Sequence, residues 1–363
     1  MKITIITPRF ALAGVPLAQI RFARALAQRG HKVKLIVGFV DPAYVLPEIT
    51  GIDIDVLNLP MVRSMLWPLV RYLRTEKPDV VFTAEDHLNT MVLMAALLAG
   101  SKTKISGSSR VTPFDTYSNT LFTKRWVLKQ LTKLVMWRAD ALTCVSRDMV
   151  LQYQKVFRNP PHVCVYNIVD DAQSRVRMHE AVDDVWLSEE RSPVLVAAGR
   201  LAPWKGFGDL IEAMALLKAR RNARLLILGD GPLRQELQAM IDTRGLQDAV
   251  KLVGYVTNPL KYFAKADVFV LSSLVEGLPN VLVEAMMCGC TPVSTNCPTG
   301  PSEVLQDGKY GYLVPMHDPQ TMAAAIERAL DNPIPKALLD EAVAPFEENR
   351  VIDRHFEMLG LQG

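Results

Sequence analysis

Short apolar runs rich in β-branched residues alternate with helical patterns along nearly all of this 363-residue chain, and no other feature limits its fold as strongly. The runs are continuous rather than alternately apolar and polar, which is typical of strands buried on both faces of a parallel sheet. Segments such as Leu17–Arg29 and Asp209–Arg220 carry apolar residues at helical spacing, so we expect helices that cover both faces. The strands that we predict are Lys2–Thr7, Lys32–Val37, Val80–Thr83, Lys104–Gly107, Ala141–Val145, Val163–Tyr166, Val194–Ala198, Leu225–Leu228, Val250–Leu252, Val268–Leu271, Thr291–Ser294 and Tyr312–Val314.

The alternation breaks once, in a charged stretch with few apolar residues. We predict a linker there, at residues 169–192, between an N-terminal domain of residues 1–168 and a C-terminal domain of residues 193–345. The last segment, 346–363, is expected to be a helix that crosses back to the N-terminal domain. The predicted fold class is α/β, with two tandem Rossmann-like doubly wound domains and a ligand site in the cleft between them.

The charge of the chain is unevenly distributed. Residues 1–180 carry 24 Lys and Arg against 14 Asp and Glu, whereas the remaining residues carry 17 against 24. The basic half indicates an anionic partner, but no nucleic-acid-binding motif accompanies it, so we expect no nucleic acid. Five scattered cysteines without a C-x-x-C pair are typical of a reducing compartment. Because the longest apolar stretch, Met91–Ala99, is too short to span a bilayer, we expect a cytoplasmic protein.

Residues 117–138 combine five cations with apolar side chains and contain no acid. A basic amphipathic helix with tryptophans, here Trp126 and Trp137, is typical of a segment that lies on an anionic membrane surface. A helix that packs on the core with a solvated basic side explains the pattern equally well. The sequence thus leaves open a peripheral contact with the cytoplasmic face of the membrane.

The first segment that indicates chemistry is GRLAPWKG, residues 199–206, directly after a predicted strand. Its glycines, beginning with Gly199, allow close approach of the backbone to a ligand, and Arg200 and Lys205 can neutralise a diphosphate. On spacing alone, a solvated loop with two surface cations is an equal alternative.

The second segment is EGLPNVLVEAMM, residues 276–287, which also follows an apolar strand. We predict Asn280 as the N-cap of a helix whose free amides can hold a phosphate. Two carboxylates, Glu276 on the loop and Glu284 on the helix, can each accept hydrogen bonds from neighbouring sugar hydroxyls. The structural alternative for Glu284 is a first-turn acid that the helix dipole stabilises by roughly 0.3–1 kcal/mol.

Together, the two segments resemble the retaining glycosyltransferases of family four, whose fold is called GT-B. The likeness rests on Gly, Arg, Lys and Gly followed by two glutamates with seven residues between them. Further matches are GDGP at residues 229–232, GPSEV at 300–304 and GYLV at 311–314. The resemblance covers nearly the whole chain and is strongest between Pro193 and Pro315.

This resemblance implies transfer of a hexose or N-acetylhexosamine, with retention, from a nucleotide-diphosphate sugar to a saccharide or lipid-linked acceptor in the synthesis of envelope polysaccharide or glycan. A UDP-sugar is the donor that the family suggests. By the same resemblance, the catalytic candidates are Arg200 and Lys205, which bind the donor diphosphate, and Glu276, which binds the transferred sugar. Glu284 binds the ribose. The other donor-binding candidates are Gly14, Gly199, Gly229, Leu278, Pro279 and Asn280.

The N-terminal half departs from the family. Members often have two adjacent glycines in the loop after the first strand, and this chain has only Gly14. Residues 106–113, SGSSRVTP, align with a subgroup pattern that reads Ser-Glu-Arg-Asn-x-Pro, with Ser109 in the place of its glutamate and Arg110 in the place of its arginine. His87 follows a predicted strand. Ser109, Arg110 and His87 are therefore the acceptor-side candidates, although a loop histidine such as His87 is more often a surface residue.

We expect no cofactor and no metal ion, because Arg200, Lys205 and a helix N-terminus supply the positive potential that the donor needs. Asp53-Ile54-Asp55 spells D-x-D, which holds a metal in a different transferase fold. Here it lies in a short alternating strand, Ile52–Leu57, with the aspartates expected to face solvent.

Two other functions compete with sugar transfer. An NAD-dependent oxidoreductase suits tandem Rossmann-like domains, but no G-x-G-x-x-G follows the first predicted strand. A catalytically inactive carbohydrate-binding protein would retain only the fold. The presence of Arg200, Lys205, Glu276 and Glu284 argues against such decay.

Overall fold

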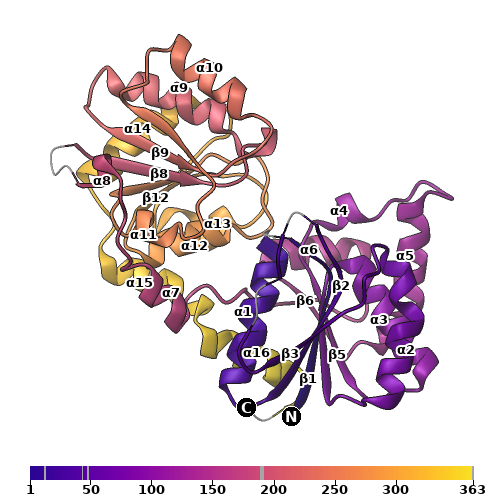
Figure 1. Ribbon diagram of the computed structural model, residues 1–363. Helices are drawn as coiled ribbons and strands as arrows, with labels where there is room; N and C mark the ends of the chain where they lie inside the picture. Colours follow the sequence, from indigo (N-terminus) through magenta and orange to yellow (C-terminus); the bar gives the residue numbers. More distant parts are fainter. Residues whose placement is uncertain (12–13, 43, 47–48, 189–191, 362–363) are drawn as a thin grey trace. The chain divides into compact units, whose positions relative to one another are not determined.

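A computed structural model describes residues 1–11, 14–42, 44–46, 49–188 and 192–361. The chain forms two compact units (Figure 1). The first unit consists of residues 1–168 together with 348–363, and the second consists of residues 169–347. Each unit contains one parallel sheet.

Seven strands form the sheet of the first unit, in the order β3-β2-β1-β4-β5-β6-β7. Their bounds are Lys2–Phe10 (β1), Lys32–Val40 (β2), Ile52–Val56 (β3), Val80–Ala84 (β4), Lys104–Ser109 (β5), Ala141–Cys144 (β6) and Val163–Cys164 (β7). The order reverses between β1 and β4. In a doubly wound sheet, such a reversal opens a crevice at the carboxyl ends of the strands, where ligands commonly bind.

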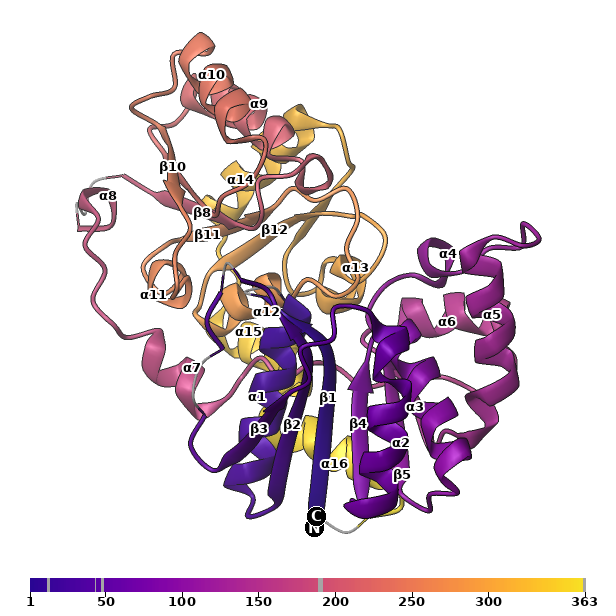
Figure 2. The ribbon, with the colours of Figure 1, turned by 45° about the vertical axis from the view of Figure 1, so that its right-hand side comes forward.

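Helices cover both faces of this sheet (Figures 1 and 2). They are α1 (Gly14–Gln28), α2 (Leu66–Thr75), α3 (Asp86–Ala99), α4 (Pro113–Thr116), α5 (Lys124–Val135), α6 (Arg147–Val156) and α16 (Glu348–Met358). On one face α16 lies beside α1, and its residues Val351, Ile352 and Phe356 share a core with that helix. On the other face α2, α3 and α5 pack around Leu69 and Val92. The C-terminal helix is thus part of the first unit.

The second unit has six strands in the order β10-β9-β8-β11-β12-β13. Their bounds are Val194–Ala198 (β8), Arg224–Leu228 (β9), Val250–Gly254 (β10), Val268–Leu271 (β11), Thr291–Thr295 (β12) and Tyr312–Val314 (β13). The helices are α7 (Ala172–Arg177), α8 (Val185–Ser188), α9 (Phe207–Lys218), α10 (Arg234–Thr243), α11 (Leu260–Phe263), α12 (Asn280–Met287), α13 (Pro301–Val304), α14 (Pro319–Asp331) and α15 (Lys336–Val343). One face packs on α9, α10 and α14, and α12 packs between α11 and α15.

The predicted fold class is confirmed, because both sheets are parallel and doubly wound. β8, β11 and β13 have the predicted bounds, since each is a continuous apolar run that ends at polar or turn residues. The C-terminal strand of the first sheet, β7, has two residues and is shorter than the predicted Val163–Tyr166.

The segment 169–192, which we expected to be a linker, instead belongs to the second unit. Its Asp171 side chain caps α7 by accepting a hydrogen bond from the Ser174 amide at 2.6 Å. Asn258, far along the chain, donates to the carbonyl oxygen of Arg177 at 2.8 Å. The polar residues that gave the segment the composition of a linker therefore cap a helix and bind the unit to which it belongs.

The basic helix predicted over residues 117–138 begins only at Lys124, as α5 followed by a 3-10 turn at Met136–Arg138. The helix begins late because the Thr123 side chain accepts a hydrogen bond from the Trp126 amide and so acts as its N-cap. Among the residues that the structure describes, no helix has the length and apolar composition needed to cross a bilayer.

Candidate functional site

Three neighbouring strands of the second unit, β9, β8 and β11, end in loops that carry most of the predicted donor-binding residues. The loops after β8 and β9 touch through their backbones. The Gly199 amide donates to the carbonyl oxygen of Leu228 at 2.9 Å, and the Leu201 amide donates to that of Asp230 at 3.0 Å. A Cβ atom at Gly229, where φ is 139°, would lie 1.9 Å from the Gly199 carbonyl oxygen. Glycine at 229 is therefore required for this contact.

The loops after β8 and β11 meet in an ion pair. The Nζ atom of Lys205 lies 2.5 Å from Oε1 of Glu276, and their side chains are 17% and 12% exposed. Ser273 donates its hydroxyl to the same carboxylate oxygen at 2.6 Å. The structure thus brings together the residue predicted for the diphosphate and the residue predicted for the sugar, which lie 71 positions apart in the sequence.

The backbone beneath this pair is also closely packed. Gly206 has a φ of 62°, and a Cβ atom there would lie 2.0 Å from the carbonyl oxygen of Ser272. The Ser272 hydroxyl donates to the Lys205 carbonyl oxygen at 2.8 Å. These contacts fix the position of the Lys205 main chain, so its ammonium group is held at the carboxyl ends of β8 and β11.

Arg200 differs from Lys205 in its surroundings. It is exposed, and within the described part of the chain its guanidinium has no hydrogen-bond or ion-pair partner. One cation of this site is therefore paired inside the protein, and the other is available to an anionic ligand.

The loop that leads into α12 is held by Thr299. Its hydroxyl donates to the carbonyl oxygens of Glu276, at 3.1 Å, and Gly277, at 2.7 Å. The helix itself begins at Asn280, preceded by Pro279, so Asn280 is the first helical residue and not the N-cap that we predicted. The reason is the turn before it, in which the Asn280 amide donates to the Leu278 carbonyl oxygen at 2.9 Å.

No acidic residue lies in the first turn of α12, so the helix leaves its positive end without a carboxylate of its own. Glu284 is the fifth residue of the helix and is partly buried. The dipole effect falls off within the first turn, so the structural explanation for Glu284 as a first-turn acid does not apply.

Sequence reasoning did not identify Cys297, which is buried near the ion pair. Burial and, to a smaller extent, the nearby carboxylate of Glu276 raise the pKa of its thiol to about 11. The thiol is therefore neutral at physiological pH.

In the first unit, Gly14 is the first residue of α1 and is exposed. A Cβ atom at this position would meet no other atom within 4 Å. Packing in the described chain therefore gives no reason for glycine at this position, and a role in donor binding stays a prediction.

His87 lies just after β4, in the first turn of α3, and its Nε2 atom is 3.3 Å from Oε2 of Glu85. Glu85 was not predicted. It has a φ of 80°, which costs energy for a residue with a side chain. Burial and, to a smaller extent, the Asp86 carboxylate raise the pKa of Glu85 to about 7, against the opposing effect of the Arg110 guanidinium. A glutamate directly after a buried strand was the signal in the sequence.

Ser109 is buried, and its hydroxyl donates to Oδ1 of Asp86 at 2.9 Å. Tyr117 and Tyr153 donate to the same carboxylate at 2.9 and 2.7 Å. Burial raises the pKa of Asp86, and the three hydroxyl groups oppose that rise. Ser109 therefore belongs to an internal network, and the structure does not place it at the surface.

Arg110 directly follows β5. Its Nη1 atom donates to Oδ1 of Asn167, and burial lowers the pKa of its guanidinium to about 10. Its Nε atom is buried and has no partner among the described residues. The structure thus places Arg110, His87 and Glu85 at the carboxyl ends of β4 and β5 in the first unit.

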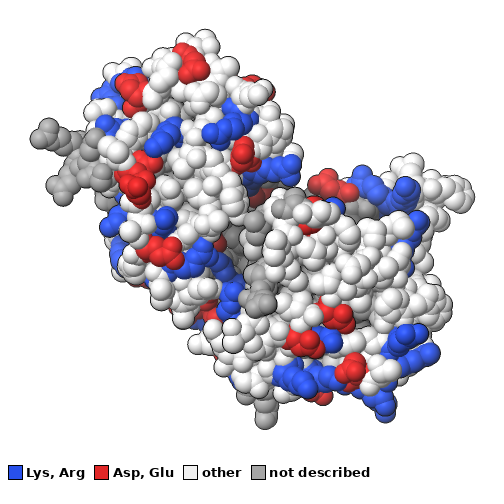
Figure 3. All heavy atoms as spheres, in the orientation of Figure 1, with Lys and Arg blue, Asp and Glu red and all other residues white. Residues whose placement is uncertain are grey.

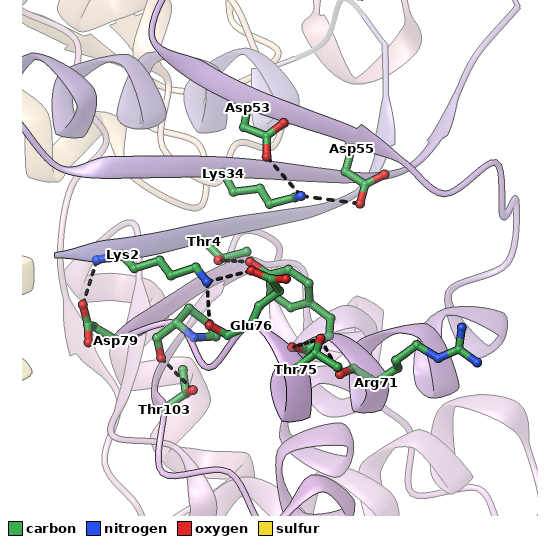
Figure 4. A network of polar contacts seen from close by, with 12 residues as sticks. Lys2, Thr4, Lys34, Asp53, Asp55, Arg71, Thr75, Glu76, Asp79 and Thr103 are labelled. Carbon is green, nitrogen blue, oxygen red and sulfur yellow. Dashed lines mark hydrogen bonds and ion pairs between the residues drawn. The ribbon is translucent and has the colours of Figure 1, made fainter.

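The D-x-D sequence lies on β3, and Figure 4 shows Lys34 between its two carboxylates. The Lys34 Nζ atom is 3.1 Å from Oδ2 of Asp53 and 3.8 Å from Oδ2 of Asp55. A lysine thus occupies the position between the aspartates. In the described ranges, no group of three or more His, Cys, Asp or Glu residues is placed to hold a metal ion.

Two family models match the chain. One, described as "Glycosyl transferases group 1", matches residues 179–344, and the other, described as "Glycosyl transferase 4-like domain", matches residues 14–167. The two matches fall in the two compact units, and residues 169–178 lie outside both matches.

Individual proteins agree with these matches. The chain is 31% identical over 289 residues to a Campylobacter jejuni protein named N-acetylgalactosamine-N,N'-diacetylbacillosaminyl-diphospho-undecaprenol 4-alpha-N-acetylgalactosaminyltransferase, covering 79% of this chain and 76% of that one. Among solved structures, Anabaena HepE in complex with UDP superposes with a TM-score of 0.77 at 19% identity, over 99% of this chain and 100% of that one. The lipopolysaccharide outer core galactosyltransferase WaaB superposes with a TM-score of 0.75 at 16% identity, over 99% of both chains.

Proposed function

Because the chain belongs to the family-four glycosyltransferases of the GT-B fold, we propose that it transfers a hexose or N-acetylhexosamine, with retention, from a UDP-sugar. The observation that carries this proposal is the Lys205–Glu276 pair at the carboxyl ends of β8 and β11. A cation for a diphosphate and a carboxylate for sugar hydroxyls lie side by side there, as a nucleotide-sugar site requires.

We assign the roles as follows. Arg200 and Lys205 bind the donor diphosphate, Glu276 binds the transferred sugar, and Glu284 binds the ribose. The amides that begin α12 face the phosphates, and Gly199 and Gly229 allow the backbone to approach the donor. When the donor enters, its phosphate competes with Glu276 for the Lys205 ammonium, so binding exchanges one ion pair for another.

Turnover depends on stabilising the departing nucleotide diphosphate as negative charge develops on it. The two cations and the positive end of α12 supply that stabilisation, and we propose that no metal ion takes part. Nothing in the described second unit is a convincing nucleophile. The leaving phosphate therefore takes the proton of the acceptor hydroxyl on the same face of the sugar, which gives retention.

The acceptor that we propose is a saccharide or lipid-linked saccharide of cell-envelope polysaccharide or glycan synthesis, bound by the first unit. The names of two similar proteins support this class of acceptor, since one is named for a diphospho-undecaprenol saccharide and the other for the lipopolysaccharide outer core. His87 and Arg110 are the acceptor-side residues, together with Glu85.

We also propose that α5 contacts an anionic membrane. Its Leu134, and Trp137 in the turn that follows it, are 68% and 66% exposed, although both are large apolar side chains. Lys124, Lys129 and Lys133 lie on the same helix. In Figure 3, Lys and Arg side chains lie near the margins of the region where Figure 1 places α2 and α5, and uncharged side chains lie between them. Exposed apolar side chains with cations around them are typical of helices at the surface of a bilayer.

Family membership bears differently on the two competing functions. Family membership does not favour an oxidoreductase. An inactive carbohydrate-binding protein shares the family and the fold, so only an assay of transfer separates it from an enzyme.

The test is a panel of UDP-glucose, UDP-galactose, UDP-N-acetylglucosamine and UDP-N-acetylgalactosamine, each mixed with the protein and an undecaprenyl-diphosphate saccharide. We expect one of them to raise the melting temperature and to release UDP faster when the acceptor is added. Stabilisation by a donor without any release of UDP would support the inactive binding protein instead.

A further inference from the structure

A small cavity lies inside the first unit, between the sheet and the helices α1 and α16. Its volume is about 20 Å³, which is room for one or two water-sized groups. It lies near the carboxyl ends of β4 and β5, where a doubly wound domain commonly binds its ligand. The polar side chains that line it come from five separate stretches of the chain, and they include Gln19, Thr83, Ser106, Arg110, Asn167 and His355.

Three of these side chains have a buried polar atom without a partner in the described chain. They are Oγ1 of Thr83, Nε of Arg110 and Nδ1 of His355. Thr83 is 2% exposed and His355 is 8% exposed, so water outside the protein does not reach them freely. Buried polar groups are almost always hydrogen-bonded, and three unpaired atoms around one cavity therefore indicate a missing partner inside it.

The charge of the cavity indicates what that partner is. Among the described lining residues, Arg110 carries the charge, because burial and, to a smaller extent, the Arg110 guanidinium lower the pKa of His355 to about 3. No carboxylate in the described residues lies within ion-pair distance of Arg110, which donates a hydrogen bond to the neutral side chain of Asn167. The Glu85 carboxyl group interacts with the guanidinium electrostatically, but its pKa of about 7 leaves it only partly ionised at neutral pH. Buried charges are normally paired, so a positive charge in this position calls for an anion.

A water molecule would satisfy the three unpaired atoms but would leave the guanidinium with only the partly ionised Glu85 carboxyl group as a counter-charge. An oxygen of a carboxylate or phosphate does both, since it accepts from the Arg110 Nε–H and the Thr83 hydroxyl and neutralises the cation. Arg110 as a whole is partly exposed while its Nε atom is buried, so its side chain connects the cavity with the surface. An anionic group can therefore insert an oxygen there while the rest of the ligand stays outside.

We propose that this cavity is an anion-binding site, in which Arg110, Thr83 and His355 bind an oxygen of a phosphate or carboxylate group. The group is either carried by the acceptor, in which case the inference rests on the proposed function, or supplied as a free ion. In both cases Arg110 recognises charge, and His355 links that recognition to the C-terminal helix α16.

The experiment measures phosphate binding by calorimetry, with sodium phosphate titrated against a sodium chloride reference of equal ionic strength. The background protein carries both Arg200→Ala and Lys205→Ala, so that phosphate held by the two donor-site cations does not contribute. We expect saturable binding to this protein. A further change, Arg110→Gln, should weaken binding at least tenfold, and Thr83→Val, which keeps the shape and removes the hydroxyl, should weaken it several-fold.

Arg71→Gln, which removes an exposed arginine of α2 outside the cavity, is the matched control and should bind as the background does. Absence of phosphate binding to the background protein would overturn the proposal and leave a buried water as the partner. The proposal would also be overturned if the Arg110→Gln and Thr83→Val proteins bound phosphate as tightly as the background protein does. Thr83→Val keeps the test decisive if Arg110→Gln fails to fold.

The two sources of the anion are distinguished by the KM for an undecaprenyl-diphosphate saccharide and for the octyl glycoside of the same saccharide. If the acceptor carries the group, Arg110→Gln raises the KM for the undecaprenyl-diphosphate saccharide at least tenfold more than the KM for the octyl glycoside. If a free ion fills the site, the ratio of the two KM values is unchanged while phosphate binding is still lost. Failure of the proposed function would appear as absence of transfer with every donor, which leaves the calorimetric result intact.

Discussion

The charged side chains at the sites of the two units differ in whether they form ion pairs. In the second unit, Lys205 is paired with Glu276 at 2.5 Å, and closely packed glycine loops support the pair. In the first unit, the partly exposed Arg110 forms no ion pair within the described residues, and the nearby Glu85 carboxyl group has a raised pKa and a positive φ. In the second unit, the charges of Lys205 and Glu276 balance each other before any ligand arrives, and the exposed Arg200 stays available beside them. The site of the first unit has unbalanced charges. Binding of a ligand or a change of pH should therefore change its charge state more than that of the second unit.

Among changes that leave every charge in place, the largest effect is expected where the backbone supports the balanced site. Gly229→Ala places a methyl group 1.9 Å from the Gly199 carbonyl oxygen, so the loops after β8 and β9 must separate. We expect the free energy of unfolding to fall by about 1–3 kcal/mol and turnover to fall by about 100-fold, because the donor-binding groups shift.

Gly14→Ala is the matched control in the first unit, because a Cβ atom there meets nothing within 4 Å. Its unfolding free energy should stay within about 0.5 kcal/mol of the wild type. Chemical denaturation measures both variants. Equal unfolding free energies of the two variants would show that the close packing at Gly229 does not contribute to stability.

The next largest effect concerns membrane binding, which we propose for the surface of the first unit and not for that of the second. Replacing Leu134 and Trp137 by serine should weaken binding to vesicles that contain phosphatidylserine by roughly tenfold or more, since both side chains are exposed and each buries apolar area in a bilayer. Flotation of the protein with the vesicles measures the binding.

Tyr255→Ser, which changes an exposed aromatic residue of the second unit, should leave vesicle binding as it is. If the wild-type protein does not float with anionic vesicles, α5 is an ordinary surface helix and the proposed membrane contact is wrong.

A smaller effect concerns pH and the unbalanced site. The pKa of Glu85 rises from 4.5 to about 7 on folding, so between these values the folded protein binds more protons than the unfolded chain. The unfolding free energy therefore falls as pH rises through this window, by an amount on the order of 1–3 kcal/mol, and this contribution is constant above it. Glu85→Gln should remove that part of the pH dependence and be more stable than the wild type at pH 8. Identical pH profiles of the two proteins would contradict the buried position of this carboxyl group.

The smallest effect is expected for metal removal. Because Arg200, Lys205 and the start of α12 supply the positive potential in our account, EDTA should change turnover by less than about twofold. Loss of activity in EDTA that Mg²⁺ or Mn²⁺ restores would contradict the proposed mechanism.

The sequence predicted the second unit better than the first, for physical reasons. Its strands are continuous apolar runs, and Lys205 and Glu276 sit in short local patterns whose chemistry can be recognised without knowing the fold. The cavity of the first unit depends on Thr83, Arg110, Asn167 and His355, which come together only when four distant segments fold. The segment 169–192 was mistaken for a linker because composition does not distinguish polar residues that cap helices from polar residues that are solvated.

The most direct test of the account is the turnover of Lys205→Ala beside that of Lys218→Ala, a lysine of the same unit whose ion pair with Asp248 lies on the surface. The account predicts that Lys205→Ala lowers kcat by about 10²–10³ while its melting curve stays cooperative. It predicts that Lys218→Ala keeps near-normal turnover, since exposed ion pairs contribute little. Similar turnover in the two variants would contradict the claim that the Lys205 ammonium stabilises the departing nucleotide diphosphate.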